Sequence, residues 1–372
     1  MVLSKDIESF LPLVTLHRRA LHRIPEIAHC EFLTQEYITG ELDKLKLKYK
    51  RHGTGVVCDL AGANKKIRVG LRADMDGLAV RELNGVEYKS AREGFMHACG
   101  HDGHMAMLLA AAAYFKENKP DFNLRLIFQP AEEGGGGAEK LIENGVLKGV
   151  DSIFALHLDP ALETGKIAVS AGVIMAGEAA FDIEFAGVSA HCAQREKGAD
   201  AVLAVALFIT RAREMMKRYD NNNLFHVGRA SGGGMRNVIA PDMKLLCTLR
   251  FFDGAAREEI MQKLTGLLTA IKDETGADHR LTVGIAYPPL RNDARAVEYV
   301  RSRVGETAEA VPAYASEDFA EYLLRVTGCF AWLGAYPGTG GQKKLHNGNF
   351  DFDEKALLYG LEYYKRILKN EG

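Results

Sequence analysis

The chain has 372 residues, 47% of them hydrophobic, and a formal net charge of −2. This length exceeds that of a typical single domain and predicts two domains with proper cores. The near-neutral charge argues against nucleic acid or an anionic membrane as a partner, and no apolar run approaches the roughly eighteen residues of a membrane span.

The first half of the chain alternates strands with helices. The predicted elements are amphipathic helices at 4–23 and 34–45, strands at 55–60 and 66–72, a helix at 105–117, and buried strands at 124–128 and 153–157. Such alternation indicates an α/β fold with a mostly parallel, helix-covered sheet. Open sheets of this kind form their sites at the carboxyl ends of the strands.

The pattern changes near residue 177. The next predicted elements are a strand at 179–185, a helix at 199–218, strands at 224–230 and 243–252, a helix at 255–274 and a strand at 280–287. This βαββαβ order is typical of a ferredoxin-like α+β domain. The remainder, with a strand at 329–333 and a helix at 353–368, is expected to rejoin the first sheet. We therefore expect a discontinuous first domain, residues 1–176 and 288–372, with residues 177–287 inserted as a second domain.

The segment HACGHDGH at 97–104 places a thiol, three imidazoles and a carboxylate within eight residues. Cys99 and His101 are two positions apart and cannot share one helical face. They are expected on the turn before a helix that begins near residue 102 or 103, where the helix N-terminus would favour a thiolate. Thiolate and imidazole bind borderline and soft divalent metals. A buried thiol beside solvated imidazoles is the alternative.

Glu132 and Glu133 follow a predicted strand and precede four glycines. In an extended chain adjacent side chains point to opposite sides, so Glu133 can ligate a metal while Glu132 faces a water. Neighbouring like charges raise a pKa, which suits a general base. His157 and His346, each taken alone, could be purely structural. Together the candidates supply enough ligands for a dinuclear centre: Cys99, His101, Glu133, His157 and His346.

Two further candidates lie in the inserted segment. His191 belongs to another module than the ligands and is interpreted as a substrate or transition-state contact. Asn237, after three glycines, is a second such candidate, with a plain loop role equally open. Glu317 and Asp318 are interpreted as an acidic pair at a helix N-terminus without a catalytic part. The glycine runs match neither a dinucleotide fingerprint nor a phosphate loop, which argues against nucleotide binding.

Eight short runs of the sequence resemble a known family. In order they are RADMDGLAV, MHACGHDGHMAMLLAAA, FQPAEEGGGGAE, ALHLDP, GVSAH, NVIAP, SEDFA and LHNGNFDFDE. They are similar to dinuclear-metal amidohydrolases related to aminoacylase and glutamate carboxypeptidase. The branch they resemble most contains hippurate hydrolase, indole-acetyl-amino-acid hydrolase and N-acetyldiaminopimelate deacetylase. The resemblance covers nearly the whole chain.

The resemblance implies roles for individual residues. The five ligands named above would hold two divalent ions, which could be zinc, manganese, cobalt or nickel. Glu132 would be the general base, and His191 would act from a lid domain, through which a homodimer would form. Asp74 stands where the broader family has a ligating histidine, which leaves its role open, while Asp76 is expected to orient a ligating imidazole. Residues 192–195 also depart from the Pro-His pattern of many relatives.

The predicted reaction is metal-dependent hydrolysis of an N-acyl amino acid, a small-molecule substrate. His191 and Asn237 would stabilise the oxyanion. A metallo-carboxypeptidase or dipeptidase acting on short peptides is the alternative. Two further alternatives involve no metal-dependent hydrolysis. In one, Cys99 is a nucleophile with His101 as its base; in the other, the protein is non-catalytic and binds metal or amino acid. Six scattered cysteines without a Cys-x-x-Cys pair favour a reducing, cytoplasmic location.

Overall fold

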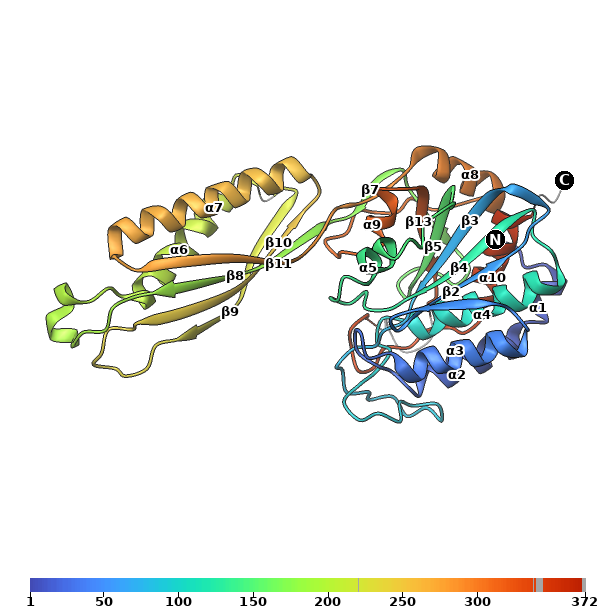
Figure 1. The fold of residues 1–372 in the computed structure, drawn as a ribbon, viewed down its shortest axis with the longest axis horizontal. Coiled ribbons are helices and arrows are strands. Elements are labelled where there is room, and N and C mark those ends of the chain that lie inside the picture. The colour runs from blue at the N-terminus through green and yellow to red at the C-terminus, as the bar shows by residue number, and fades with distance from the viewer. Residues whose placement is uncertain (220, 337, 339–343, 370–372) are drawn as a thin grey trace. The chain divides into compact units, whose positions relative to one another are not determined.

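The computed structural model describes residues 1–219, 221–336, 338 and 344–369. The chain folds into two compact units (Figure 1). Unit 1 comprises Met1–Ile174, Arg291–Val311 and Asp318–Gly372, and unit 2 comprises Met175–Leu290 and Pro312–Glu317. Among the described residues, no helix has the length and apolar character needed to cross a membrane.

A seven-stranded sheet forms the centre of unit 1, in the order β1-β2-β4-β3-β5-β13-β6. Its strands are β1 (Tyr49–His52), β2 (Gly55–Leu60), β3 (Asn64–Asp74), β4 (Phe122–Gln129), β5 (Ser152–Asp159), β6 (Ile167–Ala168) and β13 (Thr327–Gly334). Only the inner strands β4, β3, β5 and β13 run parallel, and the outer pairings are antiparallel. The prediction of a mostly parallel sheet is therefore wrong, because the sheet is mixed. A tight turn at Gly53 (φ 60) joins β1 to β2, and so short a connection permits only antiparallel pairing.

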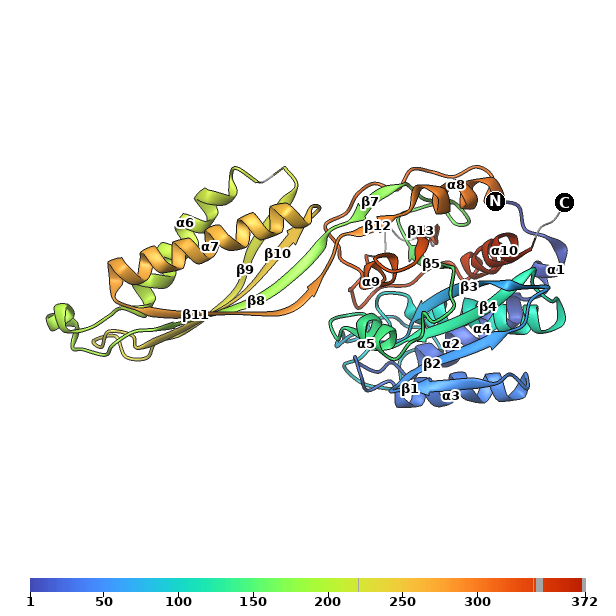
Figure 2. The same ribbon diagram turned by 45° about the horizontal axis from the view of Figure 1, so that its top comes forward.

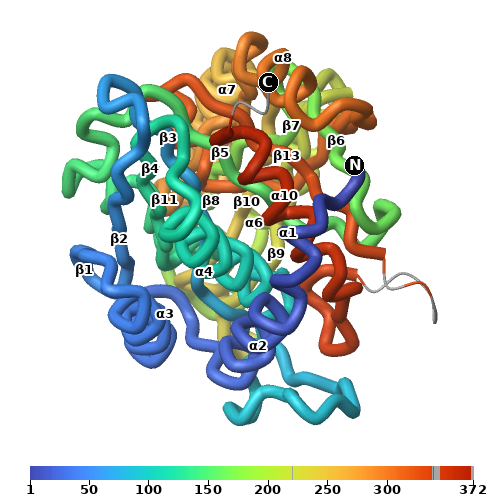
Figure 3. The backbone as a smooth tube through the Cα atoms, turned by 90° about the vertical axis from the view of Figure 1, so that its right-hand side faces the viewer, coloured from blue at the N-terminus to red at the C-terminus, as the bar shows by residue number. Residues whose placement is uncertain are grey.

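Helices cover both faces of this sheet. They are α1 (Lys5–Glu8), α2 (Leu11–His22), α3 (Phe32–Lys44), α4 (His101–Glu117), α5 (Gly137–Glu143), α8 (Ala294–Val304), α9 (Ala320–Leu323) and α10 (Ala356–Leu368). Helix α4 packs between α2 and α10 against the central strands, and Figure 3 shows these helices side by side. It is buried and apolar almost all round, as expected of a helix without a solvent face.

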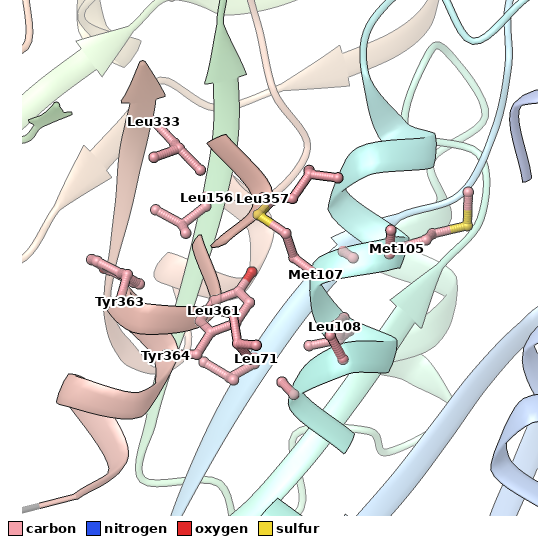
Figure 4. Packing of buried hydrophobic residues seen from close by; sticks show 14 of the residues in the cluster. Leu71, Met105, Met107, Leu108, Leu156, Leu333, Leu357, Leu361, Tyr363 and Tyr364 are labelled. Atoms are coloured by element: carbon pink, nitrogen blue, oxygen red, sulfur yellow. The ribbon is translucent and has the colours of Figure 1, made fainter. Parts of the chain in front are cut away.

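The core of unit 1 lies between α4, α10 and the parallel strands. Met107 of α4 points toward Leu156 of β5 and Leu357 of α10 (Figure 4). Gly360 permits this close packing, because a Cβ there would lie 1.9 Å from the sulfur of Met107. A larger residue would require Met107 or α10 to shift.

Distant parts of the sequence complete unit 1. Strand β13 pairs with β5 from Thr327 opposite Ser152 to Gly334 opposite Asp159. The buried Arg18 of α2 pairs with Asp102 at 3.1 Å, Asp351 at 2.7 Å and Glu354 at 3.0 Å. These contacts tie the beginning of α4 to both ends of the sequence.

Unit 2 contains a four-stranded antiparallel sheet in the order β11-β8-β10-β9. Its elements are β8 (Gly177–Ala186), the short helix η1 (Cys192–Lys197), α6 (Ala201–Met216), β9 (Asn223–Gly232), β10 (Asp242–Phe251), α7 (Gly254–Thr275) and β11 (Asp278–Tyr287). Both long helices lie on one face of this sheet (Figure 2). The carboxylates of Asp200 and Asp253 cap them by accepting backbone N–H groups. The connecting strands β7 (Gly172–Met175) and β12 (Leu290–Asn292) pair with each other.

Candidate metal centre

The structure brings the five predicted ligands together in unit 1. Cys99 lies in the turn before α4, His101 is the first residue of α4, Glu133 follows β4, His157 lies in β5 and His346 lies in a loop before α10. Two sets have ligand atoms that all lie within 4.8 Å of one another, namely Cys99 with His101 and His157, and Cys99 with Glu133 and His346. Cys99 belongs to both sets, so the five side chains form one cluster.

Helix α4 begins at His101, earlier than expected, so only Cys99 lies on the turn where both residues were predicted. Gly100 adopts a left-handed conformation (φ 93) as its N-cap, and His101 follows as the first helical residue. Glycine adopts positive φ at little cost, so it permits the sharp entry into the helix. The turn and the first helical position therefore hold the thiol and the imidazole side by side.

Two buried imidazoles present Nε2 to this cluster. The Nδ1 atom of His101 lies 2.9 Å from the backbone oxygen of Asp76, and that of His157 lies 2.9 Å from the oxygen of Leu158. A carbonyl oxygen can only accept, so each Nδ1 donates its hydrogen and leaves Nε2 as a ligand atom. The Nε2 of His101 is buried without a hydrogen-bond partner. Such an unpaired buried nitrogen fits a metal ligand.

Carboxylates give the cluster an excess of negative charge. Burial alone would lower the pKa of His101, but Asp74 and Asp76 raise it to about 10. Burial also raises the pKa of the Cys99 thiol, and Glu133 and Glu132 raise it further. The helix N-terminus was expected to favour a thiolate, but in the metal-free site burial and these carboxylates favour the thiol instead. A bound cation would reverse both effects by favouring the thiolate and displacing the imidazole proton.

The two neighbouring glutamates lie in a turn, and the extended geometry predicted for them is wrong. Glu132 accepts a hydrogen bond at its backbone oxygen from Gly134 N at 2.8 Å. Both carboxylates have an oxygen within 4.8 Å of a ring nitrogen of His101. Glu133 also has an oxygen 3.2 Å from Nε2 of the half-exposed His346. The turn therefore directs both carboxylates toward the cluster.

Asp76 holds this turn. Its Oδ1 accepts the N–H of Glu132 at 3.1 Å, and its Oδ2 accepts the N–H of Glu133 at 3.0 Å. The backbone oxygen of the same residue accepts from His101. One residue thus fixes an imidazole and both glutamates, a second layer of contacts of the kind that orients metal ligands.

Asp74 forms buried hydrogen bonds next to the cluster. It accepts hydrogen bonds from His104 Nδ1 at 2.6 Å and from Arg72 at 2.7 Å. The other ring nitrogen of His104 accepts the N–H of Leu158 at 3.0 Å, so both of its nitrogens are engaged. Burial alone would raise the pKa of Asp74, but the charges of His101 and Arg72 and the hydrogen bond from His104 hold it well below its usual range.

Arg72 and Asp318 were not identified from the sequence as parts of the site. Arg72 donates to Gln129 at 2.8 Å and to Asp318 at 2.9 Å, and Asp318 also accepts the N–H of Ala138 at the start of α5. The sequence offered one signal for this contact, an arginine inside an apolar strand. A charge buried there requires a partner of opposite charge.

His191 and Asn237 lie together in unit 2. The backbone oxygen of Asn237 accepts the N–H of Cys192 at 3.0 Å, and His191 forms a β-bridge with Val238. Both side chains are exposed. The Nδ1 of His191 accepts the N–H of Ala193 at 3.2 Å, which fixes the ring at the start of η1.

Comparisons with known proteins give the family of the chain. N-acetyl-L-cysteine deacetylase from Bacillus subtilis is 34% identical over 370 residues, 94% of this chain and 87% of that protein. N-acetyldiaminopimelate deacetylase from Shouchella clausii is 33% identical over 364 residues, 94% of this chain and 96% of that protein. The solved structure of the Bacillus subtilis YXEP protein, described as a dinuclear metal binding peptidase, is 27% identical with a TM-score of 0.84 and covers 97% of this chain and 98% of that chain. Residues 70–370 match the peptidase family M20/M25/M40, and the chain belongs to that family, as its motifs predicted.

Proposed function

We propose that the protein is a metal-dependent amidohydrolase that cleaves the amide bond of N-acyl amino acids, giving a carboxylate and a free amino acid. The observation that carries this proposal is the cluster around Cys99, with a second carboxylate, that of Glu132, beside the proposed ligand Glu133. A site that only bound metal would have no need of this additional acid. Two relatives carry the names of N-acetyl amino acid deacetylases.

We propose that the cluster holds two divalent ions, with Cys99, His101, Glu133, His157 and His346 as ligands. One thiolate, three imidazoles and one carboxylate suit zinc, and they also suit manganese, cobalt or nickel. When bound, these ions would supply Lewis acidity to the amide carbonyl and to the attacking water. The Nε2 of His101, buried without a hydrogen-bond partner, supports this assignment.

The proposed work of the protein is to move one proton and to stabilise charge. Glu132, 8% exposed, would accept a proton from the attacking water and return it to the leaving amine. Asp76 would keep that carboxylate in place through the backbone of the turn. His191 and Asn237 would stabilise the oxyanion.

We further propose that residues 177–287 act as a lid and dimerisation domain, inserted between catalytic segments 1–176 and 288–372. The family resemblance supports this, as does the separate core of unit 2. A homodimer is expected in solution. A mass of 40.8 kDa, that of the monomer, measured by light scattering after gel filtration would contradict this expectation. The cysteine pattern keeps the cytoplasm as the proposed location.

The proposed reaction is tested by turnover of a panel of N-acyl amino acids and dipeptides, with each metal added to stripped protein. Faster turnover of the acylated amino acids supports the proposal, whereas faster turnover of dipeptides favours the peptidase alternative. Glu132→Gln is expected to lose on the order of 10²–10⁴-fold in kcat while retaining its metal. Glu139→Gln, an exposed carboxylate in α5, is the matched control. An active Glu132→Gln protein would contradict the assigned base.

A further inference from the structure

The turn that carries Glu132 and Glu133 begins with an unusual backbone conformation. Ala131 has a φ of 57°, in the left-handed region that residues with a Cβ rarely adopt. The turn is tightly packed where the glycines follow, because a Cβ at Gly137 would lie 1.7 Å from the backbone oxygen of Pro130. Gly135 and Gly137 both donate their N–H groups to the oxygen of Ala131, at 3.2 and 3.1 Å. Such a conformation persists only when its surroundings impose it.

A buried carboxylate far away in the sequence contacts this turn. The Oε1 atom of Glu31 accepts the N–H of Ala131 at 2.8 Å and that of His29 at 3.0 Å. Its Oε2 accepts the hydroxyl of Thr54 at 2.6 Å. Glu31 is 0% exposed. It precedes α3 as the N-cap residue, yet its side chain makes no capping hydrogen bond to that helix.

Glu31 and Asp76 together hold three successive amides. Glu31 accepts from Ala131, and Asp76 accepts from Glu132 and Glu133. A chain with three consecutive N–H groups fixed by two buried carboxylates has little freedom to rotate. This constraint fixes the backbone from which both glutamate side chains project.

We propose that Glu31 is a positioning residue, which keeps Ala131 left-handed and thereby aims Glu132 and Glu133 at the metal cluster. The roles of the two glutamates in catalysis rest on the proposed function. The role of Glu31 in fixing the backbone of the turn does not. The competing interpretation is that Glu31 only joins the start of α3 to the β1–β2 turn through Thr54.

Glu26 offers a matched control, because it is a second buried carboxylate in the same segment. It accepts the N–H and hydroxyl of Thr34 at 3.0 and 3.1 Å and pairs with Arg92 at 2.9 Å. Replacing it disturbs the same region without removing an acceptor of the turn. Glu31→Ala removes that acceptor, whereas Glu31→Gln keeps one oxygen that can accept from Ala131.

The experiment measures hydrogen exchange of residues 131–133 in the metal-free protein, together with kcat and KM of the loaded enzyme. Glu31→Ala is expected to accelerate exchange of these amides by about tenfold or more. It is also expected to lower kcat on the order of 10–100-fold with little change in KM. Glu31→Gln should retain most of the wild-type amide protection and kcat. Glu26→Ala should leave the exchange rates and kcat near their wild-type values.

Unchanged exchange in Glu31→Ala, or equal acceleration in Glu26→Ala, would overturn the proposal. If Glu31→Ala does not fold, Thr54→Val removes one donor to the same carboxylate and should show a smaller acceleration in the same amides. No acceleration in this second variant would also overturn the proposal. A wild-type protein without activity on any acylated amino acid would refute the proposed function alone, because the exchange measurement does not require turnover.

Discussion

The Sγ atom of Cys99 lies 3.4 Å from Nε2 of His157, although the two residues are 58 positions apart. If both atoms bind the same cation, Cys99→Ser replaces a soft ligand with a poorer one. The variant is expected to retain less than two equivalents of zinc after dialysis and to lose on the order of 10²-fold in turnover. Elemental analysis measures the bound zinc, and an assay of amino-acid release measures the turnover.

Cys58 is the control for this substitution, because it is another buried cysteine of unit 1 and lies in β2, outside the cluster. Cys58→Ala should keep its metal and most of its turnover. Equal metal retention by wild type and Cys99→Ser would contradict the assignment of Cys99 as a ligand.

Removal of metal separates the proposed chemistry from the nucleophilic alternative. Burial and neighbouring carboxylates keep Cys99 a thiol when no cation is bound, which makes it a poor nucleophile. Dialysis against a chelator should therefore abolish turnover, and added divalent metal should restore it. If turnover survives chelation but is lost on thiol alkylation, the cysteine-nucleophile mechanism is correct instead.

The buried His22 should make stability depend on pH. Its Nδ1 lies 2.8 Å from Asp102 and its Nε2 lies 3.2 Å from Glu82. Burial alone would lower the pKa of His22, but these carboxylates raise it from 6.5 to about 9. Because the folded state holds this proton more tightly, the stabilisation is complete below pH 6.5 and is lost as the pH rises through about 9.

The free energy of unfolding is therefore expected to fall by about 3 kcal/mol across that range, from this group alone. Urea denaturation at several pH values measures the change. Subtracting the curve of His22→Gln removes the contribution of other titrating groups. Parallel curves for the two proteins would show that folding does not raise the pKa of His22.

A methyl group at Gly360 should destabilise the protein. Gly360→Ala places a methyl group against the sulfur of Met107 and is expected to cost about 1–3 kcal/mol in the free energy of unfolding. Gly40 in α3 has open space around its Cβ position, so Gly40→Ala should stabilise the protein by about 1 kcal/mol through helix propensity. Opposite shifts in thermal midpoint are expected, and equal shifts would contradict the packing argument.

The sequence allowed prediction of those features that depend on local pattern. The density of ligand types at 97–104 indicated a metal site, although only Cys99 and His101 of that segment belong to the cluster. Strand β1 was missed because Tyr49–His52 is polar and charged, without an apolar face, and its absence left the mixed sheet unrecognised. The contact of Glu31 with Ala131 could not be predicted, because it joins residues 100 positions apart.

The position of β13 has a consequence for how the protein is made. Until residues 327–334 have been synthesised, β5 has no neighbour on one side, and α4 lacks the cover of α10. Unit 2 draws almost all its residues from one continuous stretch, so it can form its own core first. The nascent chain must therefore carry an unfinished sheet with an exposed edge through more than a hundred further residues of translation, the interval in which such edges aggregate and chaperones bind.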